Sequence, residues 1–199
     1  ADMLSEYISV IGPKKCLARI ESSKRWARNF LRGIGLERYN PDFVNIKNTK
    51  HNIITNDYSV PLENCRRFME LYDGRIVIKL DGLEGGKGVS VWGRDFTDIE
   101  SALVICEKYL KINKSFLLEE CLIGKEFSLI SLSDGVSSVG FPPVVDFKPL
   151  RDGNCGPNTG SMGAIYDGGK CGFLSDEEIN KFRSIFSIMR NNIIKFIFS

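Results

Sequence analysis

Hydrophobic and polar residues follow one another in patterns that predict short strands joined by amphipathic helices. Apolar runs bounded by turn residues predict strands at 8–11, 76–80, 88–92, 115–120 and 126–132, with a brief one around 43–46. Apolar positions at helical spacing predict helices over 22–33, 61–72 and 97–111, and another that begins near 175. This order predicts an α+β fold with a small, largely antiparallel sheet.

Cap and turn residues define the ends of several of these elements. Thr97–Glu100 and Ser175–Glu178 have the Ser/Thr-x-x-Glu spacing of a capping box, which starts a helix. Ser133-Asp134-Gly135 predicts a hairpin turn after the strand at 126–132. Residues 34–58 and 140–173 are expected to be mostly loop.

Composition excludes several classes of function. Apolar residues make up 43% and charged residues 26%, as in ordinary soluble proteins. The net charge of +2 gives no electrostatic case for nucleic acid or for a membrane surface. No apolar run reaches the ~18 residues of a spanning helix. The six scattered cysteines, with no secretory signal, fit free thiols in a reducing cytosol, so we expect a cytoplasmic protein. The single histidine, His51, and the lack of a CxxC pair argue against a zinc site and against a histidine-activated nucleophile.

Residues 76–91, IVIKLDGLEGGKGVSV, place a glycine-rich stretch between two predicted strands. Glycine lets backbone N–H groups approach an anion closely, and consecutive N–H groups form a concave site for phosphate. Lys79 on the first strand and Lys87 in the loop add positive charge. The spacing matches neither a Walker A loop nor a dinucleotide fingerprint. A flap over phosphates and a ligand-free hairpin turn both remain compatible with these residues.

Two further stretches carry candidate chemistry. In LLEECLIGKEF, residues 117–127, a strand ends in acidic residues. The backbone edge at such a strand end could read an adenine while a nearby carboxylate takes the ribose hydroxyls, or the segment could form only an exposed acidic turn. DFKPLRDGNCGPNTGSMGAI, residues 146–165, has the composition of a long functional loop, with a disordered linker as the alternative.

These three stretches, in this order, resemble glycinamide ribonucleotide synthetase (phosphoribosylamine–glycine ligase) of the ATP-grasp superfamily. The run GPNTGSMG is similar to this family in particular, whereas the glycine-rich stretch resembles the superfamily as a whole. Details such as GLEGGKG are nearest to archaeal members. The resemblance covers nearly the whole chain and implies a partial ATP-grasp fold with small, mostly antiparallel sheets and flanking helices.

The resemblance also implies roles for individual residues. It implies ATP contacts at Lys24, Lys79, Gly85, Gly86, Lys87, Gly88, Glu119, Glu120, Leu122 and Glu126. It implies a side facing glycine and 5-phosphoribosylamine at Asp146, Lys148, Asn158, Thr159 and Gly160. In the implied reaction, ATP with Mg²⁺ phosphorylates the glycine carboxylate, and the amine of 5-phosphoribosylamine then displaces phosphate, without a protein nucleophile.

Some positions depart from the family pattern. Phe147 stands where a histidine is expected, and Pro149 where an arginine is expected. The family's Mg²⁺-binding strand finds no match, so we expect a central fragment without metal ligands. Its parts would be a leading segment with the start of the ATP-grasp region (1–58), a lid subdomain with the glycine flap (59–133) and the start of a second subdomain (134–199). An incomplete purine-pathway ligase and a non-catalytic ATP-binding module are the two readings.

Overall fold

A computed structural model describes residues 2–85, 88–169 and 171–198 of the chain. The chain forms two compact units, Ala1–Leu122 and Ile123–Ser199. No helix within the described residues is both long enough and apolar enough to cross a membrane.

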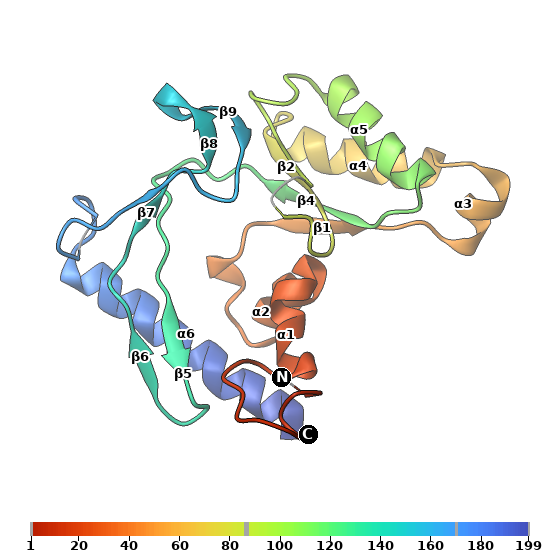
Figure 1. Cartoon of the computed structure of the whole chain (residues 1–199). Coiled ribbons are helices and arrows are strands. Elements are labelled where there is room, and N and C mark those ends of the chain that lie inside the picture. The colour runs from red at the N-terminus through yellow and green to blue at the C-terminus, as the bar shows by residue number, and fades with distance from the viewer. Residues whose placement is uncertain (1, 86–87, 170, 199) are drawn as a thin grey trace. The chain divides into compact units, whose positions relative to one another are not determined.

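The first unit is built around a four-stranded antiparallel sheet (Figure 1). Its strands, in the spatial order β1-β4-β2-β3, are β1 (Phe43–Ile46), β4 (Phe116–Glu120), β2 (Ile76–Leu80) and β3 (Val89–Val91). Its helices are α1 (Lys15–Ser22), α2 (Lys24–Gly33), the 3₁₀ turn η1 (Glu37–Tyr39), α3 (Lys50–Thr55), α4 (Ser59–Leu71) and α5 (Ile99–Lys111).

The two faces of this sheet carry different side chains. Successive residues of a strand point to opposite faces, and in β2 the residues Ile76, Ile78 and Leu80 are buried while those between them are only partly buried. The buried set packs in one hydrophobic core with residues of α4 and α5, among them Met69 and Leu110. The opposite face of β2 and β4 is directed toward α2, on the other side of the sheet from α4 and α5 (Figure 1). One face therefore forms the core, and the other is available for polar chemistry.

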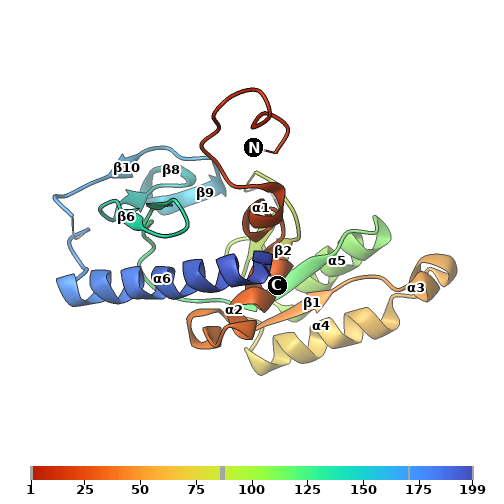
Figure 2. The ribbon, with the colours of Figure 1, turned by 90° about the horizontal axis from the view of Figure 1, so that it is seen from below.

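The second unit consists of short strand pairs and one long helix. Its elements are β5 (Ser131–Ser133), β6 (Ser138–Gly140), β7 (Val145–Asp146), β8 (Pro149–Arg151), η2 (Asp152–Asn154), β9 (Cys155–Asn158), β10 (Ala164–Ile165) and α6 (Asp176–Phe198). The strand pairs are β5–β6, β7–β10 and β8–β9, all antiparallel. Figure 2 shows α6 as a single uninterrupted helix. The ring of Phe127 lies 5.3 Å from that of Phe182 on α6, which ties the helix to the unit.

Most of the predicted elements are confirmed, as is the α+β class. The strands at 43–46 and 76–80 have the expected bounds. The second capping box is present, since the Glu178 N–H donates to the Ser175 hydroxyl (3.2 Å) and the Ser175 N–H donates to the Glu178 carboxylate (2.8 Å). The hairpin around Ser133–Gly135 is also present, although its first strand begins at Ser131 and not at 126.

The predictions for residues 8–11 and for the start of α5 are wrong. Residues 8–11 form no strand, and Ile11 is fully exposed, because an apolar run becomes a strand only beside a partner that takes its hydrogen bonds. The cap of α5 is Asp98 and not Thr97. Its carboxylate accepts from the Ser101 N–H at 2.8 Å, while Glu100 is engaged by Arg66.

The second half of the expected loop at 34–58 contains a helix. Thr49 and Asn52 form a reciprocal capping box that starts α3, and His51 lies exposed on this helix instead of in a loop. The helix α1 was likewise not expected. The three-part division at 58/59 and 133/134 stays a prediction, although β1 from the first part pairs with β4 from the second.

Candidate functional site

A cleft of about 520 Å³ opens in the first unit between α2 and the turn that follows β2. It is lined by Ile20, Glu21, Lys24, Ala27, Arg28, Lys79, Gly82, Leu83, Glu84 and Gly85. Three of these residues, Lys24, Arg28 and Lys79, are cationic. The cleft therefore holds three cations, together with the acidic residues Glu21 and Glu84, next to the glycine-rich turn.

Helix α2 supplies two of the three cations. Lys24 and Arg28 are four residues apart, so they lie on the same face of the helix. The helix is fixed at its start by Ser23, whose hydroxyl accepts from the Trp26 N–H at 3.2 Å. The Lys24 ammonium donates to the carbonyl oxygen of Gly82 at 2.7 Å, which joins the helix to the start of the turn.

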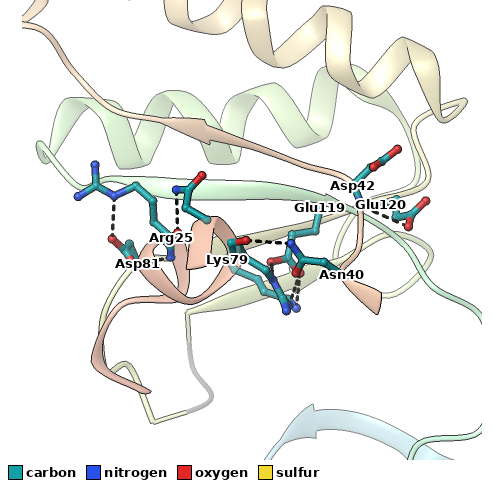
Figure 3. Close-up of polar contacts among 9 residues, drawn as sticks. Arg25, Asn40, Asp42, Lys79, Asp81, Glu119 and Glu120 are labelled. Carbon is teal, nitrogen blue, oxygen red and sulfur yellow. Dashed lines mark hydrogen bonds and ion pairs between the residues drawn. The ribbon is translucent and has the colours of Figure 1, made fainter. Parts of the chain in front are cut away.

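The third cation, Lys79, reaches the cleft because of the strand register. Val77 lies opposite Glu119 in the β2–β4 pair, so Lys79 and Glu119 are diagonal neighbours on one face of the sheet. Long side chains at such diagonal positions can touch, and the Lys79 ammonium lies 2.6 Å from a carboxylate oxygen of Glu119 (Figure 3). The face directed toward α2 thus carries an ion pair.

Arg28 completes a three-residue ion network around the same carboxylate. Its Nε donates to Glu119 Oε1 at 2.7 Å and its Nη2 to Oε2 at 3.1 Å, a bidentate pair. The side chain of Glu119 is 2% exposed, while those of Arg28 and Lys79 are each 25% exposed. Burial favours the neutral acid, but the hydrogen bonds and charges of Arg28 and Lys79 outweigh it and hold the pKa of Glu119 below its ordinary value. The carboxylate is therefore ionised when the cleft is formed.

Asp81 anchors the start of the glycine-rich turn to α2. Its Oδ1 accepts from the Arg25 backbone N–H and from the Ser23 hydroxyl, both at 3.2 Å. Figure 3 shows Asp81 beside Arg25. A carboxylate at this place is favoured because the first N–H groups of a helix lack intrahelical partners and carry partial positive charge. The cations of α2 and the turn are thus held in one arrangement.

The turn itself requires glycine at particular positions. Gly82 has φ 110° and Gly85 has φ 56°, conformations that other residues rarely adopt. Gly88 is buried, and a Cβ added to it would lie 2.9 Å from the Cβ of Glu84. The expected ATP contacts Gly86 and Lys87 lie outside the described residues.

The residues expected to hold adenine lie at and beyond the end of β4. Glu120 accepts from the Asp42 N–H at 3.2 Å, and Asp42 accepts from the Tyr72 hydroxyl at 2.7 Å. That hydrogen bond, with partial burial, raises the pKa of Tyr72 to about 12. Leu122 is 69% exposed. The described residues that line the cleft include neither Glu120 nor Leu122.

The second unit brings together most of the residues expected on the substrate side. Lys148 forms an ion pair with Asp146, whose other oxygen accepts from the Ser161 hydroxyl at 2.6 Å. The Thr159 N–H and hydroxyl donate to the carbonyl of Lys148 at 2.7 and 2.8 Å. The hydrogen bond from Lys148, then that from Ser161, holds the pKa of Asp146 below its ordinary value. The loop is thus an ordered assembly of short strand pairs rather than a disordered linker.

The other expected residues of this unit lie in a strand pair or at exposed positions. Asn158 lies opposite Pro149 in the β8–β9 pair, and Gly160 is exposed, with no atom within 4 Å of the position that a Cβ would take. Glu126 is exposed. Among the described residues, no group of three or more His, Cys, Asp or Glu side chains is arranged to hold a metal ion.

Sequence reasoning therefore found one set of cleft residues and missed another. Lys24, Lys79 and Gly85 line the same cleft. Glu119 forms an ion pair with Lys79, one of these lining residues. Arg28 and Asp81 were not anticipated as site residues. The signal for Arg28 was its position one turn after Lys24 on the helix predicted for 22–33. With three cations among its lining residues, the cleft can bind a multiply charged anion.

Comparisons with known proteins agree with one family. The model of the phosphoribosylglycinamide synthetase ATP-grasp (A) domain matches residues 22–196. The phosphoribosylamine–glycine ligase of Methanosarcina barkeri is 37% identical over 187 residues, covering 93% of this chain and 40% of that protein. The ligase of the same name from Pyrococcus horikoshii is 35% identical, covering 80% of this chain and 33% of that protein. The chain thus spans at most about 40% of the length of these relatives.

Solved structures give the same result. The phosphoribosylamine–glycine ligase of Thermotoga maritima superposes with a TM-score of 0.74 at 27% identity, covering 97% of this chain and 45% of that one. The D-alanine–D-alanine ligase of Helicobacter pylori shares the fold, with a TM-score of 0.58 at 13% identity. The chain belongs to the phosphoribosylglycinamide synthetase family, as a representative of its ATP-grasp (A) domain.

Proposed function

We propose that this chain provides the ATP-binding part of a ligase that joins glycine to 5-phosphoribosylamine and yields glycinamide ribonucleotide, ADP and phosphate. The observation that carries the proposal is the cleft in which Lys24, Arg28 and Lys79 converge beside the glycine-rich turn. The family match and the names of the relatives support the identity of the reaction.

The proposal gives each group of residues a role. Phosphate oxygens of ATP would be held by Lys24 and Lys79, under a turn formed by Gly85, Gly86, Lys87 and Gly88. Adenine would lie against Glu119, Glu120 and Leu122, and the ribose against Glu126. Glycine and 5-phosphoribosylamine would face Asp146, Lys148, Asn158, Thr159 and Gly160.

The chemistry requires positioned charge more than a reactive side chain. An oxygen of the glycine carboxylate attacks the γ-phosphorus and ADP leaves; the amine nitrogen then attacks the carbonyl carbon of the glycyl phosphate and phosphate leaves. Charge that develops on phosphate oxygens is stabilised by fixed ammonium groups and backbone N–H groups. Mg²⁺ would accompany ATP and neutralise part of its charge, and no described side chain is assigned to it.

Isothermal titration calorimetry with ATP and with adenosine tests the proposed cleft. ATP should bind more tightly than adenosine, and Lys79→Met should weaken ATP binding by about tenfold, the equivalent of one charge-assisted contact. Lys111→Met is the matched control, because Lys111 is an exposed lysine paired with Glu107 on α5. Equal affinity for ATP and adenosine, or an unchanged affinity in Lys79→Met, would refute the cleft as a phosphate site.

A turnover assay tests the reaction. The chain is incubated with ATP, Mg²⁺, glycine and 5-phosphoribosylamine, and glycine-dependent ADP formation is measured. Turnover supports ligase activity in the chain itself. Saturable ATP binding without turnover instead supports a non-catalytic ATP-binding module.

A further inference from the structure

The ion network at the floor of the cleft joins two cations to one carboxylate. Arg28 and Lys79 both pair with Glu119, and both are partly exposed to the cleft, whereas Glu119 is 2% exposed. The network as a whole carries one surplus positive charge. The two cations are not equivalent partners, however, because Arg28 contacts both carboxylate oxygens and Lys79 contacts one.

We propose that Arg28 is a positioning residue that neutralises Glu119 and thereby frees the Lys79 ammonium to bind phosphate. The inference rests on the proposed function, since it concerns how the same cleft binds ATP. Its physical basis is the cost of a buried, unpaired carboxylate. Were Lys79 the sole partner of Glu119, moving its ammonium to a phosphate would leave that carboxylate without a counter-charge.

The geometry of Arg28 suits this role. A guanidinium donates two parallel hydrogen bonds to a carboxylate, so both oxygens of Glu119 keep a partner after Lys79 departs. The backbone of Arg28 is also held in place, since its carbonyl accepts a hydrogen bond from the Asn40 side-chain amide at 3.1 Å. Lys79, by contrast, has a flexible stem and a single contact with the carboxylate. The exchange of Lys79 from carboxylate to phosphate therefore leaves the arginine–glutamate pair intact.

Two other roles for Arg28 are possible and make different predictions. Arg28 could bind phosphate directly, or it could only fasten α2 to β4. In the first case its removal weakens ATP binding whether or not Glu119 is charged. In the second its removal lowers stability without a specific effect on phosphate.

The experiment is a double-mutant cycle on the full chain with ATP as the probe, measured by titration calorimetry, and adenosine as the reference ligand. Arg28→Met should weaken ATP binding by about tenfold, because Lys79 must then remain on Glu119. In the Glu119→Gln background the same substitution should change ATP affinity by less than about twofold, since Lys79 no longer has a carboxylate to neutralise. Adenosine affinity should not follow this pattern.

Controls separate a binding effect from a folding effect. Arg67→Met removes an exposed arginine–glutamate pair on α4 and should leave ATP affinity unchanged. Both tryptophans, Trp26 and Trp92, lie in the first unit, so their fluorescence reports whether that unit is folded in each variant. If Arg28→Met does not fold, the comparison of Glu119→Gln with Arg28→Met/Glu119→Gln carries the test.

The outcomes separate this inference from the function on which it rests. A tenfold loss in both backgrounds assigns Arg28 to direct phosphate contact and overturns the positioning role. Unchanged ATP affinity in Arg28→Met, together with weakened affinity in Lys79→Met, overturns this inference alone. Absence of ATP binding by the unmodified chain overturns the proposed function and this inference with it.

Discussion

Glu119 in the first unit and Asp146 in the second each form an ion pair with a lysine. The partner of Glu119 is Lys79, diagonal to it across two strands, and the partner of Asp146 is Lys148, two positions later in the sequence. Glu119 is 2% exposed and held by two cations. The side chain of Asp146 is 20% exposed, with Lys148 and the Ser161 hydroxyl as its partners, and that of Lys148 is 40% exposed. Removal from water makes an unpaired charge costly, so the same kind of ion pair supports the fold in the first unit and mainly orients a loop in the second.

The largest effect is expected where the carboxylate is buried. Glu119→Ala leaves Arg28 and Lys79 without their partner and should lower the free energy of unfolding of the first unit by about 3 kcal/mol, the lower end of the range because the two cations are partly solvated. Urea unfolding followed by Trp26 and Trp92 fluorescence measures it. If the free energy of unfolding falls by less than about 1 kcal/mol, Glu119 behaves like a surface carboxylate. Its ion pairs would then contribute no more to stability than that of Asp146.

A smaller loss is expected from crowding beneath the glycine-rich turn. Gly88→Ala would place a Cβ 2.9 Å from the Cβ of Glu84 and 3.0 Å from the Cβ of Leu80, so it should cost about 1–3 kcal/mol. Gly160→Ala is the counterpart in the second unit, where no atom lies within 4 Å of the added Cβ. Urea unfolding followed by far-ultraviolet circular dichroism should separate the two variants; equal stability would mean that the turn adjusts freely.

Acid should affect the first unit through Glu119. Its pKa in the folded unit lies below the ordinary 4.5, so its stabilising contribution is present above that value and is lost as the pH falls through the lower, folded pKa. Unfolding curves of the unmodified chain and of Glu119→Gln between pH 7 and pH 3 test this. The free energy of unfolding should fall less steeply with acid in the variant, and parallel curves would contradict the assignment.

The smallest effect on stability is expected at Asp146. Asp146→Asn keeps one accepting oxygen and replaces the other with an NH₂ group, so it can accept from Lys148 or Ser161 but not from both. The ion pair is partly exposed to water, so global unfolding should hardly change. Hydrogen–deuterium exchange of 156–163 is the sensitive measurement, because the loop closes through the Thr159 bonds to Lys148. Faster exchange confined to this segment is expected. A large drop in the free energy of unfolding would contradict this, because Asp146 would then support the fold as Glu119 does in the first unit.

Local patterns predicted much of the fold. The apolar run at 76–80 forms β2 with the expected bounds, and the capping box at Ser175 starts α6 as its spacing indicated. The same kind of apolar run at residues 8–11 forms no strand. A strand depends on a partner segment that its own residues do not specify.

The candidate site was predicted less completely than the fold. Lys79 was recognised from its place on the strand before the glycine-rich stretch and Lys24 through family likeness, and both line the cleft. Arg28 was missed because its partner Glu119 lies 91 positions away in the sequence. No local spacing links two such residues, and an arginine on an amphipathic helix usually faces solvent.

The sequence by itself determined the class of fold, most of its strands and helices, and the family to which the chain belongs, because periodicity, caps and motif spacing act over a few residues. Only the tertiary structure decided that one carboxylate is shared by a lysine and an arginine at the base of a cleft. That decision depends on the register of β2 against β4, which sets Lys79 diagonal to Glu119, and on the placement of α2 over the same face of the sheet. Burial then turns this proximity into a strong ion network, because a charge removed from water must find its partner within the protein.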